Sequence, residues 1–127
     1  MEIKHFSDKY GVYFEMMAPG GLYVSKAYTE ITNCPPKWLI DALNLQNRHL
    51  IYFCNFGTKH LFRGKGYGRK LLQDVKKYYE NCVVYLGVGS CGVLSNEQLV
   101  KFYESEGFKI IEEAKKHVSY PMMAIEL

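Results

Sequence analysis

The sequence predicts a single α/β domain, in which helices flank a mixed β-sheet. The chain has 127 residues, of which 48% are apolar and 23% charged, as in an ordinary globular domain. Strand-forming residues dominate the first third, and residues 50–88 contain an apolar segment, an amphipathic segment and a second apolar segment. A domain of this length needs neither disulfides nor metal to hold a core. We therefore expect residues 1–127 to form one domain.

The N-terminal third predicts an antiparallel meander of three strands. Residues 2–6, 11–17 and 22–32 are rich in strand formers, and Ala18-Pro19-Gly20-Gly21 is typical of a turn. Two prolines then end the third strand. Apolar residues recur at helical spacing after them, which predicts a short helix over 36–46.

The middle of the chain predicts a βαβ unit. Residues 50–58 and 82–88 are almost continuously apolar, as in strands that are covered on both faces. Between them, 69–81 forms an amphipathic helix whose apolar face carries Leu71, Leu72, Val75, Tyr78 and Tyr79. The two strands of such a unit run parallel, with a right-handed crossover.

The C-terminal part predicts a helix and a β-hairpin. The helix covers 96–106 and is stopped by Gly107, which is a common residue at helix ends. Strands at 108–111 and 120–127 then pair across a long loop.

Composition excludes several classes of protein. Sixteen basic and thirteen acidic residues leave a net charge of +3, which is too small to indicate nucleic-acid binding. No apolar run approaches the ~20 residues that span a membrane, and the first residues lack the apolar stretch of a signal peptide. We therefore expect a cytoplasmic protein. Because no C-x-x-C pair occurs, we expect no metal site and reduced, buried cysteines at Cys34, Cys54, Cys82 and Cys91.

A glycine-rich turn, Arg63 to Lys70, lies where the buried strand gives way to the amphipathic helix. The first amides of a helix lack partners within it, so a phosphate group can accept several N–H bonds there. The spacing fits neither the Walker loop nor the dinucleotide fingerprint. The remaining pattern is R-x-x-G-x-G over 63–68, and its alternative interpretation is a tight turn with incidental lysines.

A second pattern, N-x-x-[apolar]-x-x-F-Y-x-x-x-G-F, covers Asn96 to Phe108. Together the two patterns resemble the GCN5-related N-acetyltransferase (GNAT) superfamily, and 120–127 is similar to the last strand of that family. The resemblance covers about residues 50–127. It implies an enzyme that transfers an acetyl or other short acyl group from coenzyme A to an amine.

The resemblance also implies which residues bind acetyl-coenzyme A. The strands 50–58 and 82–88 would splay apart and hold the pantetheine arm, aided by Asn96. Backbone groups at the end of the first strand would face the thioester, and the turn would hold the pyrophosphate. The residues implied for the thioester contact are Phe56, Gly57 and Thr58. Those implied for the pyrophosphate contact are Arg63, Gly64, Lys65, Gly66, Tyr67, Gly68 and Arg69.

Catalysis would depend on Tyr103, whose position in the pattern lies next to the thioester sulfur in the family. A tyrosine there can donate a proton to the departing thiolate when the amine attacks directly. The alternative interpretations are that Asn96 caps a helix and that Tyr103 belongs to the core. The general base is open among Glu15, Glu30, His49 and His60, because 50–62 contains no carboxylate.

The N-terminal part, residues 1–49, departs from the family. It would form the acceptor side, yet it predicts only the 36–46 helix, whereas 50–127 would form the acyl-CoA-binding core. The acceptor therefore stays open: a protein amine, a polyamine, an antibiotic or a modified nucleotide. The loop 89–95 also looks longer than usual, so it would either fold over the thioester, reach a partner or be a tolerated insertion.

Other functions stay open at this stage. A fold of this kind also serves as a non-catalytic coenzyme-A-binding sensor or interaction module. The basic turn interleaves lysines with a tyrosine as single-strand binders do, but a phosphate-rich co-substrate explains the same lysines. A homodimer in which the C-terminal strands meet would suit so small a sheet.

Overall fold

The computed structural model describes residues 1–89 and 94–127. Within these ranges the chain forms seven β-strands, three α-helices and two short 3₁₀-helices, which confirms the predicted mixed α/β fold. The chain divides into two compact units, Met1–Ile31 with Tyr52–Glu80 and Thr32–Ile51 with Asn81–Leu127. The single domain over 1–127 stays a prediction.

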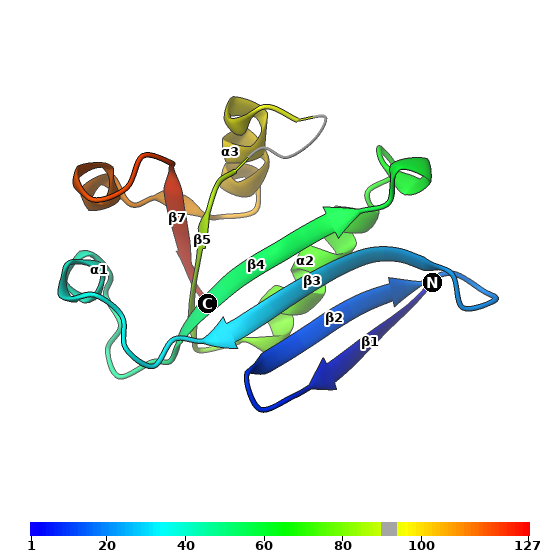
Figure 1. Ribbon diagram of the computed structural model, residues 1–127, viewed down its shortest axis with the longest axis horizontal. Coiled ribbons are helices and arrows are strands. Elements are labelled where there is room, and N and C mark those ends of the chain that lie inside the picture. Colours follow the sequence, from blue (N-terminus) through cyan, green and yellow to red (C-terminus); the bar gives the residue numbers. More distant parts are fainter. Residues whose placement is uncertain (90–93) are drawn as a thin grey trace. The chain divides into compact units, whose positions relative to one another are not determined.

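The first unit contains the predicted antiparallel meander (Figure 1). Its strands are β1 (Glu2–Ser7), β2 (Gly11–Met17) and β3 (Tyr23–Ile31), followed in the sheet order by β4 (Leu50–Thr58). The register pairs Phe6 with Tyr13 and Tyr13 with Tyr28, and a bulge shifts it at Met17. A three-residue turn joins β1 to β2, so no helix separates them. This confirms the reduced N-terminal helical region.

Helix α2 (Tyr67–Tyr78) packs on one face of β2 and β3 (Figure 1). Its residues Leu71, Leu72 and Val75 are buried, as predicted. The ring of Phe14 lies 5.2 Å from that of Tyr78 between centroids. Tyr78 therefore packs on this face, although 45% of the residue stays exposed.

Polar contacts also fasten α2 and the residue that follows it to the meander. The Tyr79 hydroxyl is hydrogen-bonded to Thr29 Oγ1, and the His5 Nε2 atom lies 2.6 Å from Asp74 Oδ2. The helix begins two residues before the predicted range 69–81, because Gly66 supplies a left-handed cap. It ends three residues early, and Asn81 has a positive φ of 67° in the turn that follows.

The second unit contains α1 (Lys37–Ala42), β5 (Val83–Gly87), α3 (Asn96–Ser105), β6 (Lys109–Ile110) and β7 (Met122–Glu126). Strand β7 pairs antiparallel with both β5 and β6, which confirms the predicted C-terminal hairpin. The Val83 N–H donates to His49 O at 2.9 Å, so β5 and β4 start side by side. Its core contains Leu39, Leu50, Val83, Ile111, Ala114 and Met122.

Two features of the second unit differ from the expectation. The helix predicted over 36–46 ends at Ala42, since Leu43 is extended and both Gln46 and Asn47 have positive φ. The long hairpin loop contains a 3₁₀-helix, η2 (Glu112–Lys116), that the sequence did not predict.

The described cysteines are free thiols, but they are not all buried. Cys34 is exposed, because it follows the end of β3 and precedes two prolines, so its predicted burial is wrong. Cys54 and Cys82 are half-buried. Cys91 and most of the loop 89–95 lie outside the described residues. Among the helices of 1–89 and 94–127, none is long and apolar enough to cross a membrane.

Candidate active site

The last residues of β4 form one side of the candidate site in the first unit. Asn55 takes a left-handed conformation, with a φ of 52°, and interrupts the extended backbone just before Phe56. Ser25, which is fully buried, donates its hydroxyl to Gly57 O at 3.0 Å and lies 3.0 Å from Thr58 Oγ1. The neighbouring strand β3 thus fixes the end of β4.

A tight connection joins β4 to α2. It contains a 3₁₀-helix, η1 (His60–Phe62), after which Arg63 Nε donates to Thr58 O at 3.0 Å. The predicted phosphate ligand Arg63 therefore also ties the turn back to β4. Gly64 and Gly66 have positive φ values of 77° and 81°, and beyond their chain neighbours no atom of the described residues lies within 4 Å of where a Cβ would stand. Both glycines are needed for backbone conformation, and the space beside them is open.

Gly68 has a different role from the other two glycines. It lies inside α2, where a Cβ would stand 3.1 Å from Thr58 Oγ1 and 3.3 Å from Phe56 Cζ. The missing side chain lets the first turn of the helix approach β4 closely. The third glycine of the pattern therefore sets the packing of helix on strand.

The N-terminus of α2 is suited to bind an anion. Its N-cap Gly66 supplies no side-chain hydrogen bond, its first turn carries no acidic residue, and its first intrahelical bond runs from Lys70 N–H to Gly66 O. The amides of residues 67–69 precede that bond and point out of the helix end, where the dipole adds partial positive charge. Arg63, Lys65, Arg69 and Lys70 are exposed around it.

The second unit contains the other two predicted residues, on α3. Ser95 caps this helix through a capping box with Gln98, so the interpretation of Asn96 as the cap is wrong. Asn96 is the first helical residue and is exposed. Its predicted contact with the pantetheine arm is untested.

Tyr103 lies on the same helix, two turns further on. It is only 8% exposed, and its ring centroid lies 5.3 Å from that of Phe102 and 5.6 Å from that of Phe108. Burial raises its pKa to about 12. The phenol therefore keeps its proton at neutral pH and is a weaker acid than a tyrosine in water, which favours hydrogen-bond donation over full proton transfer.

The four candidate bases lie in different settings. Glu15 stands between Lys4 and Lys26 in the register, and Glu30 is 4.0 Å from Cys54 Sγ. His49 and His60 are exposed at the two ends of β4. Burial, and then the charge of Glu30, raise the pKa of the Cys54 thiol to about 11, so this thiol is no nucleophile at neutral pH.

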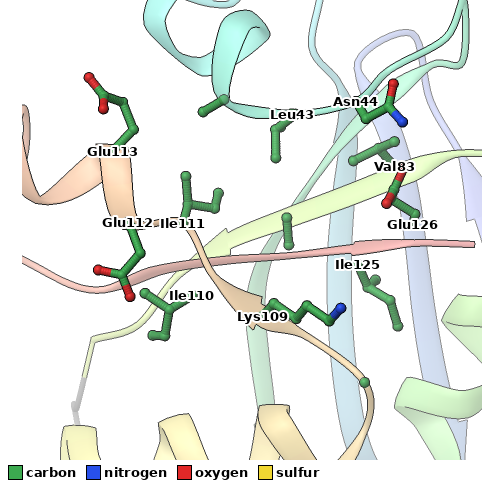
Figure 2. A pocket seen from close by; sticks show the side chains of 13 residues that line it. Leu43, Asn44, Val83, Lys109, Ile110, Ile111, Glu112, Glu113, Ile125 and Glu126 are labelled. Atoms are coloured by element: carbon green, nitrogen blue, oxygen red, sulfur yellow. The ribbon is translucent and has the colours of Figure 1, made fainter.

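A separate cavity of about 680 Å³ opens in the second unit (Figure 2). Leu43 and Ile111 point toward its centre, and Glu112, Glu113 and Glu126 stand on its rim. Each of these carboxylates already pairs with a cation of the same unit, namely Lys115, Lys116 or Arg48. Within the described residues, no group of His, Cys, Asp or Glu is arranged to hold a metal ion.

Comparison with solved structures places the fold among acetyltransferases. The ribosomal-protein-S18-alanine N-acetyltransferase of Escherichia coli is 16% identical, with a TM-score of 0.66 over 94% of this chain and 71% of that one. The Bacillus subtilis N-acetyltransferase YlbP, solved in complex with coenzyme A, is 10% identical, with a TM-score of 0.67 over 91% and 67%. The protein PH1933 of Pyrococcus horikoshii is 23% identical, with a TM-score of 0.62 over 91% and 64%.

No curated protein matches the chain in sequence. The family model described as "Acetyltransferase (GNAT) domain" matches residues 39–127, which include the glycine-rich turn, α2, α3 and the C-terminal hairpin. The chain therefore belongs to the GNAT acetyltransferase family.

Proposed function

We propose that this protein is an N-acetyltransferase that uses acetyl-coenzyme A, or another short acyl-coenzyme A, as co-substrate. The observation that carries the proposal is the N-terminus of α2, where the N-cap Gly66 supplies no side-chain hydrogen bond and two positive-φ glycines lie in front of the helix. The family supports it, as does the Bacillus subtilis protein of the same fold that was solved with coenzyme A.

The residues of the turn fit a diphosphate. Its oxygens would accept hydrogen bonds from the amides of residues 64–69, and the open space beside Gly64 and Gly66 allows the backbone to approach it. The exposed cations Lys65 and Arg69 would balance its charge. Arg63 already contacts Thr58 O through Nε, so only its terminal nitrogens remain for a phosphate oxygen.

Coenzyme A supplies a thioester, whose acyl carbon accepts a nucleophile when the thiolate leaves. The end of β4 would then present backbone groups of Phe56, Gly57 and Thr58 to the pantetheine arm and the thioester carbonyl. Ser25 supports this role, because its bond to Gly57 O holds the peptide plane in a fixed direction. A fixed N–H dipole stabilises developing oxyanion charge without reorganisation.

In the proposed reaction the acceptor amine attacks the acyl carbon, the C–N bond forms and the C–S bond breaks. Tyr103 would donate a hydrogen bond to the departing sulfur, and Asn96 would contact the pantetheine arm. With its pKa near 12, the phenol stays protonated across the physiological range. The sulfur leaves as the coenzyme A thiolate, and the amine gives up one proton to water as the amide forms.

Two observations favour a second candidate function, a non-catalytic coenzyme-A-binding module. The strand β4 carries no carboxylate, and the most buried candidate acid, Tyr103, is weakened by its burial. Such a module would bind coenzyme A on the same turn without turnover.

Two measurements on the same preparation test the proposal. Calorimetry with coenzyme A measures binding, and release of free thiol from acetyl-coenzyme A measures transfer across a panel of amines. The proposal expects saturable binding and thiol release with at least one class of amine. Binding without release for any amine would favour the non-catalytic module, and absence of binding would contradict both.

A further inference from the structure

The open face of the meander carries an ordered pattern of side chains. Strand alternation puts Phe14, Ala27 and Thr29 on the face that α2 covers (Figure 1). The opposite face of the same strands carries Phe6 and Tyr13, which are 48% and 42% exposed. Single exposed apolar residues are ordinary, but a contiguous aromatic row across three strands indicates a binding surface.

The aromatic row is built by the register. Phe6, Tyr13 and Tyr28 stand opposite one another on β1, β2 and β3, and the last two rings are 4.4 Å apart between centroids. Gly11 leaves room for the Tyr28 ring, because a Cβ there would stand 2.9 Å from the Tyr28 hydroxyl oxygen. The row thus forms a platform, and interface cores are rich in such aromatic residues.

Charged residues flank the platform with opposite signs. On β3, Lys26 lies two residues before Tyr28 and Glu30 lies two residues after it, on the same face. On β2, Glu15 stands level with Lys26, whereas Gly11 stands level with Glu30. On β3, the face therefore has a positive residue on one side of the aromatic row and a negative residue on the other side.

From this pattern we infer that the open face of β1–β3 binds the same face of a second copy of the chain. A two-fold axis that runs across the strands along the aromatic row places Lys26 against Glu30 of the second copy, twice. The same axis stacks the aromatic row of one copy on the aromatic row of the other. It also sets Glu15 of one copy opposite Gly11 of the other, which carries no charge. Sheets pack face to face in this aligned manner, about 10 Å apart.

Other arrangements of two copies are less favourable. A two-fold axis along β2 would place Glu15 against its own equivalent and Lys4 against Lys26, so that like charges meet. Nucleic acid is also a less favourable partner for this face, because the negative charges of Glu15 and Glu30 lie within it and would repel phosphate groups. Of these two axes, the one across the strands brings opposite charges together.

Sedimentation velocity of the full chain over a range of concentrations tests the inference. We expect a reversible dimer whose dissociation constant rises about tenfold with Lys26→Glu or Glu30→Lys, because two ion pairs become repulsive contacts. The double variant Lys26→Glu/Glu30→Lys restores the opposite charges and should recover dimerisation. Lys101→Glu, an exposed residue of α3, is the charge-matched control and should leave the dimer unchanged.

Three results would overturn the inference. A wild-type chain that stays monomeric up to its solubility limit would show that this face has no self-association. A dimer that is indifferent to both charge reversals would have another interface, such as the C-terminal strands. Failure of the double variant to recover would contradict the proposed axis. Circular dichroism checks that each variant folds. If the charge reversals unfold the chain, Lys26→Gln and Glu30→Gln take their place, and weaker dimerisation is expected for these variants too.

Discussion

Replacing Gly66 by alanine adds a single methyl group to the glycine-rich turn and tests whether this turn binds coenzyme A. The glycine has a φ of 81°, and within residues 1–89 and 94–127 no atom outside its chain neighbours lies within 4 Å of the new Cβ. The folded state therefore loses stability only through backbone conformation, and a left-handed non-glycine residue costs about 1–2 kcal/mol. Gly21 has a φ of 82° and equally open surroundings, so Gly21→Ala should lower the free energy of unfolding by the same amount.

The two variants should differ in coenzyme binding. The methyl group on residue 66 would enter the space that we assign to the diphosphate, whereas Gly21 lies in the turn between β2 and β3. Loss of one hydrogen bond to a charged group costs about 1.5–3 kcal/mol. The dissociation constant for coenzyme A should therefore rise about tenfold to a hundredfold in Gly66→Ala and stay unchanged in Gly21→Ala.

Urea unfolding and calorimetric titration with coenzyme A measure the two effects on the same preparations. If Gly66→Ala loses stability but binds coenzyme A as the wild type does, the diphosphate does not lie on this turn. Equal losses of affinity in both variants would instead point to a general effect of stability on binding, and would also refute the reasoning.

Four further predictions concern single groups. Tyr103→Phe should lower kcat about tenfold to a hundredfold with unchanged coenzyme affinity, measured by thiol release; an unchanged kcat would exclude its hydrogen bond to the sulfur. Because burial raises the Tyr103 pKa from 10 to about 12, the unfolded state releases this proton first, so stability should hold below pH 10 and fall between pH 10 and 12. Urea unfolding should show a smaller fall over this range in Tyr103→Phe, and an equal fall would contradict the assignment. Ser25→Ala removes the bond to Gly57 O and should cost about 1–2 kcal/mol of unfolding free energy; wild-type stability in urea would show that the bond contributes nothing. Lys65→Gln and Arg69→Gln should each weaken coenzyme binding and flatten its dependence on salt in titrations at two ionic strengths, whereas a wild-type salt dependence would remove them from the site.

The sequence predicts the elements well where the local pattern and the packing agree. The strand predicted over 50–58 coincides with β4. The expectation that both of its faces are covered is wrong for its second half, where Asn55 and Gly57 are exposed. Helix ends are less well predicted. The lysines and tyrosines at the end of α2 continue the helical pattern to residue 81, but Asn81 turns the chain out of it with a positive φ.

The backbone of the glycine-rich turn was predictable because glycine spacing reflects backbone needs directly. Gly64 and Gly66 do adopt positive φ, as a loop before a helix N-terminus requires. The separate role of Gly68 was not predictable, since it depends on the distance to Thr58 on another element. Two supporting residues were also missed: Asn55 and Ser25. An asparagine inside an apolar strand is the only signal for the first, because asparagine tolerates the left-handed conformation.

Features that arise from tertiary packing left no local signal. Ser25 lies in a strand that merely alternates, and its bonds to Gly57 and Thr58 appear only when β3 and β4 pair. The pKa of Tyr103 depends on its burial beside Phe102 and Phe108, and the pattern contains both residues but does not show how their rings pack on Tyr103. Likewise, the sequence placed the aromatic residues in strands, but the shared level of Phe6, Tyr13 and Tyr28 follows from the observed register.

Amide NMR during a titration with coenzyme A tests the central claim most directly, because each backbone N–H reports separately. The account predicts that the largest saturable shifts fall on the amides of residues 64–69, with further shifts at Phe56, Gly57 and Thr58. Saturable shifts that instead gather around Ile111 in the cavity of the second unit, or no saturable shift in the turn, would contradict it.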